Sequence, residues 1–148
     1  MKFSKRLSRE ADREFLWALH QNSMREYVDQ TWGWRDADQR TRFNQSSRPG
    51  DREIIEIENV PVGFISTESI PGKLRLLSIE ITPSYQRQGI ATSLIQDLIS
   101  KATNADQLVE LQVLRVNPAR KLYERLGFAL RSETKTHFIM EHPAGCSV

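Results

Sequence analysis

The sequence predicts an α/β protein with a mixed sheet of about six to seven strands flanked by about four helices. Three observations predict it: a strand–turn–helix stretch over 74–98, a strand over 108–116 that runs into a helix, and short alternating strands separated by tight turns. A strand–helix–strand succession requires parallel neighbours, whereas short turns favour antiparallel pairs, so the sheet should contain both kinds.

The N-terminal part of the chain is predicted to hold an edge strand and two helices. The expected elements are a strand over 2–7, a helix over 9–27, a helix over 35–47 and a turn at 48–51. Ser8 is a good N-cap for the first helix, and the polar run Gln21-Asn22-Ser23 is expected to break it. Phe43 is the one large apolar anchor of the second helix.

The middle and the C-terminal part alternate strands with helices. The expected elements are strands over 53–57, 60–66 and 74–81, a helix over 90–104, a strand over 108–116, a helix over 117–126 and strands over 128–131 and 136–141. Asn117 is expected to cap the second of these helices with Pro118 at its first position, and Gly127 to end it. No repeat or linker divides the chain, so we expect a single domain over 1–148.

Composition narrows the possible partners and compartments. The net charge is +2, without the dense basic face that nucleic acid requires. No apolar run approaches the ~20 residues that span a membrane. Cys146 is the one cysteine, so no disulfide forms within the chain and a reducing, cytoplasmic location is expected. Its place in the tail makes Cys146 a poor candidate for a nucleophile.

The turn between the central strand and the following helix is the first candidate functional segment. Gly89 and Ala91 stand where the helix begins, so backbone N–H groups over 88–92 are expected to point at an oxyanion. Arg87 adds a positive charge beside them. Taken alone, this spacing also fits an ordinary strand-to-helix turn.

Tyr123 is the second candidate. It lies in the segment Leu122-Tyr-Glu-Arg-Leu-Gly-Phe128, four residues before the glycine that ends the helix. Taken alone, it also fits a core aromatic at helical spacing with Leu122 and Leu126.

The two segments together resemble the GNAT superfamily of acetyl-CoA-dependent N-acetyltransferases, over most of residues 60–140. The resemblance implies a GNAT-like fold, acetyl-CoA as co-substrate and no metal. It implies that the coenzyme A pyrophosphate binds at Gln86, Arg87, Gln88, Gly89, Ile90, Ala91 and Thr92. It further implies contacts of the pantetheine arm with Ile79, Ile81, Asn117 and Ala119, and it makes Tyr123 the general acid.

Two positions depart from the family pattern. Arg75 stands where the histone-modifying branch has a glutamate base, eleven residues before Gln86. The family often has Asn seven residues before the tyrosine; here Val116 is at that spacing and Asn117 is six before. Asn117 therefore either reaches the pantetheine or serves only as the helix cap.

The general base is left open by the sequence. Glu80 lies on the right strand, although alternation points it away from Ile79 and Ile81, and a solvated or ion-paired carboxylate fits it too. The further candidates are Glu26, Glu68, His20 and a water molecule.

Residues 1–50 are expected to form the acceptor side and 60–140 the acetyl-CoA-binding core. Tyr27, Trp32 and Trp34 either wall an acceptor pocket, with Asp29 and Asp36 near enough to attract a cation, or pack over the core. The expected acceptor is the primary amine of a small molecule; a protein α-amine or lysine is the alternative. A non-catalytic acyl-CoA-binding module is the alternative of another class. By analogy with the family, a homodimer through the strand around 138–140 is also considered.

Overall fold

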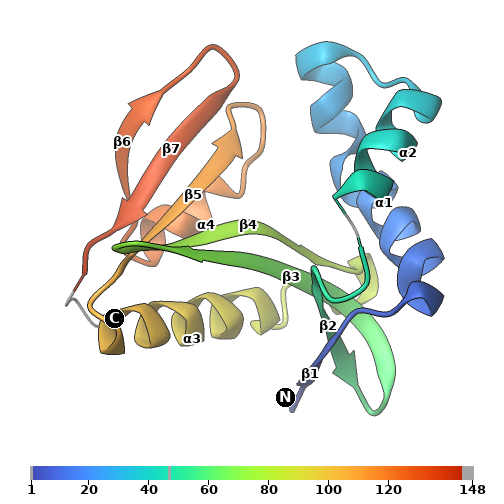
Figure 1. Ribbon diagram of the computed structural model, residues 1–148. Coiled ribbons are helices and arrows are strands. Elements are labelled where there is room, and N and C mark those ends of the chain that lie inside the picture. The colour runs from blue at the N-terminus through green and yellow to red at the C-terminus, as the bar shows by residue number, and fades with distance from the viewer. Residues whose placement is uncertain (1, 47, 145–148) are drawn as a thin grey trace. The chain divides into compact units, whose positions relative to one another are not determined.

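The computed structural model describes residues 2–46 and 48–144 (Figure 1), so Cys146 lies outside the described residues. Its elements in chain order are β1 (Ser4–Leu7), the short 3₁₀ helix η1 (Glu10–Asp12), α1 (Arg13–Trp32), α2 (Asp36–Gln45), β2 (Glu53–Ile57), β3 (Val60–Ile70), β4 (Lys73–Ile81), the 3₁₀ helix η2 (Pro83–Tyr85), α3 (Ile90–Asn104), β5 (Leu108–Leu114), α4 (Arg120–Arg125), β6 (Ala129–Glu133) and β7 (His137–His142). Among the described helices, none has the length and apolar character needed to cross a membrane.

The sheet is mixed, as the sequence predicts. Within the described residues, seven strands follow the order β1-β2-β3-β4-β5-β7-β6. The pair β4/β5 is parallel, with Leu74 opposite Val109 and Leu76 opposite Leu111. The pairs β1/β2, β2/β3, β5/β7 and β6/β7 are antiparallel. The predicted fold class is therefore confirmed.

The chain divides into two compact units, which are described separately. The first contains the residues up to Ser66 together with Ser78–Ile90, and the second contains Thr67–Leu77 together with the described residues from Ala91 onward. The strands β3 and β4 each contribute to both units.

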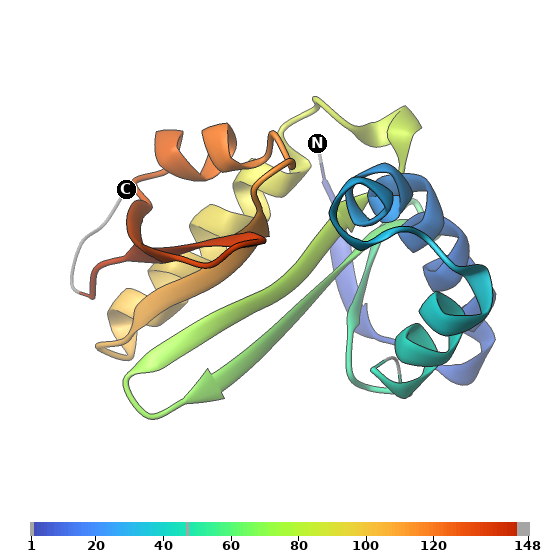
Figure 2. The same cartoon turned by 90° about the horizontal axis from the view of Figure 1, so that it is seen from above.

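In the first unit, α1 and α2 lie together beside β1 and β2 (Figure 2). Their shared core consists of Leu16, Trp17, Leu19, Phe43, Ile54 and Phe64. Each such side chain contributes about 1.5–3 kcal/mol by leaving water. The expected break at 21–23 is wrong: α1 is continuous, because its buried face extends from Leu16 to Val28 on both sides of the polar run.

The start of α1 also differs from the expectation. Ser8 does not cap the helix; its Oγ accepts hydrogen bonds from the N–H groups of Gly50 and Arg52 at 3.2 and 3.4 Å. The N–H of Arg9 instead donates to the carboxylate of Asp12 at 2.8 Å. Asp12 also accepts two hydrogen bonds of 2.8 Å from Arg6, which holds the pKa of this carboxyl below its usual value. Ser8 therefore ties the helix start to the loop before β2.

In the second unit, the two faces of the sheet differ in character. Val109, Leu111 and Val113 on β5 are buried, and they stand opposite buried His142, Met140 and Phe138 on β7. The other face carries Lys73, Arg75 and Glu110 in one ion-paired group.

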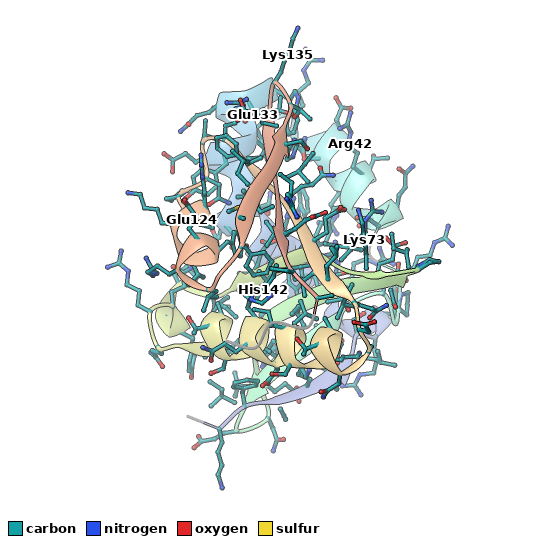
Figure 3. The ribbon with its side chains drawn as sticks, turned by 90° about the vertical axis from the view of Figure 1, so that its left-hand side faces the viewer. Arg42, Lys73, Glu124, Glu133, Lys135 and His142 are labelled. Atoms are coloured by element: carbon teal, nitrogen blue, oxygen red, sulfur yellow. The ribbon has the colours of Figure 1, made fainter. Side chains whose placement is uncertain are left out.

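The place of β7 in the strand order determines whether it can pair with another chain. Since β7 lies between β5 and β6, its backbone is already paired on both sides. The expectation that the strand around Phe138–Met140 is free to pair with a second copy is therefore wrong; the edge strand next to β7 is β6. Glu133 ends β6, and Lys135 projects from the turn beyond it (Figure 3).

Candidate active site

The last residues of β4 are fixed to the turn that follows them. Ile79 is half-buried, whereas Glu80 and Ile81 are both buried, so the strict alternation of the strand ends here. The side-chain amide of Gln86 donates to the carbonyl oxygen of Ile81 at 2.9 Å. The N–H of Thr82 donates to the carbonyl oxygen of Val62 at 2.8 Å. The turn thus starts from an anchored strand end.

The turn over 86–89 presents its backbone N–H groups to solvent. Arg87 and Gly89 have φ values of 62° and 84°, in the left-handed region that strains a residue with a side chain. The N–H groups of Arg87, Gln88 and Gly89 find no acceptor among the described residues. A Cβ placed on Gly89 meets no atom within 4 Å.

This turn has the features that an oxyanion requires. The open space above Gly89 lets a ligand approach the backbone, and the 15-residue helix α3 begins immediately after it at Ile90. The positive end of the helix dipole therefore adds to the unpaired N–H groups. The side chain of Ile90 is buried, whereas Ala91 and Thr92 are half-buried in the first turn of α3. The predicted phosphate-binding residues thus fit a pyrophosphate.

Glu80 and His20 form a pair inside the first unit. The Oε2 atom of Glu80 lies 3.3 Å from Nδ1 of His20 on α1, so the carboxylate points toward the helices. Its second oxygen, Oε1, is buried and has no hydrogen-bond partner among the described residues. Gly63 on β3 allows close approach here, because a Cβ on it would lie 2.5 Å from the carbonyl oxygen of Glu80.

Arg52 is a buried cation that sequence reasoning missed. Its guanidinium lies 4.7 Å from the ring centre of Phe43 and 4.5 Å from that of Phe64. It also donates to Oγ of Ser78 at 3.1 Å. Burial lowers the pKa of Arg52, against the attraction of Glu80. No local pattern marks a buried arginine in the loop before a strand, so the sequence carries no signal for it.

Aromatic rings surround His20. Its ring is stacked on Phe43 at 4.8 Å and lies 6.1 Å from Trp17 and 6.2 Å from Trp34. Trp17, on the same helix face as His20 by its i, i+3 spacing, was also missed, although that spacing was a usable signal. The structure thus places Trp34, a predicted acceptor-pocket residue, next to His20.

The other predicted acceptor residues lie around the end of α1. The backbone N–H of Trp34 donates to Asp29 at 2.9 Å, and its indole N–H donates to Asp36. Trp32 is 58% exposed and lines a cavity of about 390 Å³ with Gly33, Arg35, Asp38, Gln39 and Arg42. Tyr27 is half-buried on α1. Asp29 and Asp36 therefore hold the Trp34 segment in place.

Tyr123 lies on α4 in the second unit. Its ring is buried and makes an edge-on contact with Phe128 at 5.9 Å. Burial raises the pKa of its hydroxyl to about 12. The hydroxyl has no hydrogen-bond partner among the described residues, yet it is not among the atoms sealed from solvent. It is therefore a protonated, accessible donor.

Asn117 lies in the turn before α4. Its Oδ1 accepts a hydrogen bond of 2.9 Å from the N–H of Ala119. The helix begins only at Arg120, and its N-cap residue is Ala119, so the expectation that Asn117 caps it with Pro118 at its first position is wrong.

Arg75 and Glu68 are engaged with each other in the second unit. Arg75 lies 3.0 Å from Glu110 and 3.7 Å from Glu68. Lys73, and Arg75 after it, hold the pKa of Glu110 below its usual value against the effect of burial. Arg75 thus belongs to an ion-paired network. Among the described residues, no group of three or more His, Cys, Asp or Glu side chains is arranged to hold a metal ion.

Known proteins match this architecture. The ribosomal protein bS18-alanine N-acetyltransferase of Haemophilus influenzae is 34% identical to this chain over 86 residues, which are 57% of this chain and 58% of that protein. The chain thus spans less than two thirds of this curated relative. The PaiA N-acetyltransferase of Thermoplasma acidophilum, solved with coenzyme A, has a TM-score of 0.75 at 19% identity and covers 97% of this chain and 99% of its own.

Two further comparisons agree. The S18-alanine N-acetyltransferase of Escherichia coli has a TM-score of 0.66 at 20% identity, over 99% of this chain and 97% of its own. The model of the acetyltransferase (GNAT) family matches residues 12–128, which contain the turn over 86–89, the His20–Glu80 pair and Tyr123. The chain belongs to the GNAT family of acetyltransferases.

Proposed function

We propose that this protein is an N-acetyltransferase that moves the acetyl group of acetyl-CoA directly onto a primary amine. The turn over 86–89 carries the proposal, because it combines three unpaired N–H groups, open space above Gly89 and a helix start. A pyrophosphate is the part of acetyl-CoA that such a turn binds. The backbone of Ile79 and Ile81 would then run along the pantetheine arm.

The chemistry needs a proton donor for the leaving group. The thiolate of coenzyme A, with a pKa of about 8.5 if it resembles cysteine, leaves more easily when it receives a proton. Tyr123, with its pKa raised to about 12, remains protonated at neutral pH. Because the phenol is then a weaker acid than the thiol, it first stabilises the thiolate by donating a hydrogen bond. Tyr123 is therefore the proposed general acid.

A small-molecule amine is the proposed acceptor. An amine arrives as a cation, and aromatic and acidic neighbours favour it. In the first unit such neighbours are Trp34 and the buried carboxylate of Glu80. Because Glu80 is only 8% exposed, a slim amine reaches its surroundings more readily than a folded protein surface does.

A protein α-amine is the second candidate acceptor. It is favoured by the 34% identity over 86 residues to an enzyme named for an alanine of ribosomal protein bS18. The two candidates differ only in what the amine is attached to, so one assay separates them.

Release of free thiol from acetyl-CoA tests the proposal. The amine panel should contain polyamines, amino acids, an aminoglycoside, and a peptide with an N-terminal alanine beside the same peptide with its terminus blocked. Turnover on small amines supports the proposal, and turnover on the open peptide alone supports the second candidate. Thermal stabilisation by coenzyme A without turnover on any amine contradicts both and indicates a binding module.

A further inference from the structure

We propose that His20 takes the proton from the acceptor amine, and that Glu80 is a positioning residue that holds His20 for this role. The inference rests on the function proposed above, and it names the proton acceptor that the reaction needs in addition to the general acid. Three features of the first unit support it: the imidazole of His20 on α1, the carboxylate of Glu80 on β4, and the aromatic rings around His20.

Only one of the two carboxylate oxygens of Glu80 has a polar partner among the described residues. Oε2 lies 3.3 Å from Nδ1 of His20, whereas Oε1 is buried without a hydrogen-bond partner among the described residues. Leaving such an atom unpaired costs about 1–3 kcal/mol or more. A fold that keeps an unpaired carboxylate oxygen beside an imidazole has an arrangement typical of a functional site.

This pairing determines which nitrogen of His20 is available. A carboxylate accepts hydrogen bonds, so Nδ1 carries the proton that it donates to Glu80, and the lone pair is on Nε2. Nε2 has no partner among the described residues and is not among the atoms sealed from solvent. Because the His20 side chain is 20% exposed, an incoming molecule reaches Nε2.

The aromatic cluster fixes the orientation of the imidazole. Phe43 stacks on it at 4.8 Å, and Trp17 and Trp34 lie 6.1 and 6.2 Å away. A ring held on several sides keeps Nε2 in one place, which is what proton transfer in a transition state needs.

Three arginines set the charge around the pair. Arg52 attracts Glu80 from the loop before β2, Arg25 of α1 lies over Trp34 at 5.5 Å, and Arg40 of α2 lies over Trp17 at 5.2 Å. Arg52 offsets the carboxylate charge of Glu80. With a neutral imidazole, the charges of Arg52 and Glu80 therefore offset each other, and the proton that His20 accepts adds one positive charge.

Glu80 lies on the strand expected to hold the acetyl donor. Glu80 stands between Ile79 and Ile81, whose backbone is the proposed track of the pantetheine arm, and Ile81 is tied to the phosphate-binding turn by Gln86. A side chain fixed by Glu80 is therefore at the strand that positions the thioester.

With this assignment, every proton in the acetyl transfer has a donor and an acceptor. The ammonium first gives one proton to Nε2 of His20, which leaves a neutral amine. The amine nitrogen then forms a bond to the acetyl carbon, and the bond between that carbon and the coenzyme A sulfur breaks with its electron pair on sulfur. The nitrogen releases its second surplus proton to solvent, and the thiolate receives a proton from Tyr123. Solvent then returns His20 and Tyr123 to their starting forms, and the products are the N-acetyl amine and the free thiol.

His20→Asn is the first test variant, because asparagine retains a donor toward Glu80 but has no nitrogen that accepts a proton. We expect its kcat for the best amine to fall about 100-fold, within the usual range for a general base. The dissociation constant of acetyl-CoA should stay within about twofold of that of the unchanged protein, since no binding group is removed. The loss should shrink for acceptors of low pKa and at alkaline pH, where the amine is already neutral.

Glu80→Gln is the second variant, and Glu58→Gln, at an exposed position in the turn between β2 and β3, is its matched control. Glu80→Gln should lower kcat about tenfold, and adding it to His20→Asn should have little further effect, because Glu80 acts through His20. Wild-type turnover in His20→Asn, or a loss independent of acceptor pKa, overturns the inference while leaving the proposed function intact. A large loss in Glu80→Gln with an active His20→Asn makes Glu80 itself the base and also overturns it.

Nitrogen NMR of His20 tests the geometry without any turnover. The unchanged protein should show the Nδ1–H tautomer, and Glu80→Gln should remove that preference. An Nε2–H tautomer in the unchanged protein contradicts the assignment, whether or not the amine panel yields a substrate.

Discussion

The side-chain amide of Gln86 donates to the carbonyl oxygen of Ile81 at 2.9 Å, so the turn over 86–89 is tied to the last residue of β4. Gln86→Ala removes this tie and loosens the turn. We expect the KM for acetyl-CoA to rise about fivefold with kcat nearly unchanged, as for the loss of one neutral hydrogen bond. Steady-state kinetics measure it, with Gln96→Ala on the exposed face of α3 as control. An unaltered KM would show that the tie does not order the turn.

Gly89→Ala separates backbone strain from ligand contact. Gly89 has a φ of 84°, so alanine costs about 1 kcal/mol there, although its Cβ meets no protein atom within 4 Å. The Cβ would stand in the space where we propose that the pyrophosphate binds, so acetyl-CoA should bind at least about tenfold more weakly.

The matched control is Gly50→Ala, because Gly50 has a φ of 87° and equally open surroundings. Both variants should lose similar stability in thermal melts, and only Gly89→Ala should lose affinity in calorimetry. Equal affinities in the two variants would remove the turn from the binding site.

Tyr123→Phe tests the general acid. The hydroxyl has no protein partner, so its removal should leave stability at neutral pH unchanged. We expect kcat to fall about 10- to 100-fold with the affinity for acetyl-CoA preserved. Tyr85→Phe, in the short helix before the turn, is the control. Undiminished turnover in Tyr123→Phe would exclude the hydroxyl from the mechanism.

The sequence predicts best what is local in the chain. Gly89 and Tyr123 are candidates because each lies in a short segment whose spacing carries the information, and the strands are predicted from their alternation. The length of α1 was misjudged because its continuity depends on the buried face from Leu16 to Val28, and tertiary packing outweighs the weak helix propensity of the polar run between them.

Pairings between distant residues were beyond the sequence. Glu80 and His20 are 60 positions apart, and only the packing of α1 on the strands brings them together. Arg75 stands at a catalytic position of some relatives, but it pairs with Glu110 across 35 positions. A contact between side chains of different helices and strands leaves no period or spacing in the sequence that could reveal it.

Arg75→Glu restores the residue type of the histone-modifying branch and should still not improve catalysis. It replaces the cation between Glu68 and Glu110 by a third carboxylate. We expect a loss of on the order of 1–2 kcal/mol in the free energy of unfolding, smaller in high salt because exposed charges are screened. Urea titration at two salt concentrations measures it, and Arg75→Met is the uncharged control. A stability equal to that of Arg75→Met would contradict the repulsion.

The burial of Tyr123 also predicts a loss of stability in alkali. Burial raises its pKa to about 12 in the folded chain from 10.0 in the unfolded chain. Above the lower value the unfolded chain releases its proton first, so ionisation favours unfolding as the pH rises through this window. The full shift corresponds to about 2–3 kcal/mol, so the unchanged protein should lose that much more stability than Tyr123→Phe between about pH 10 and pH 12. Urea titrations of the two proteins across this range measure the difference, because every other titrating group is common to both. Parallel stability curves for the two proteins would mean that the phenol ionises as easily in the fold as in the unfolded chain, and that α4 does not exclude water from it.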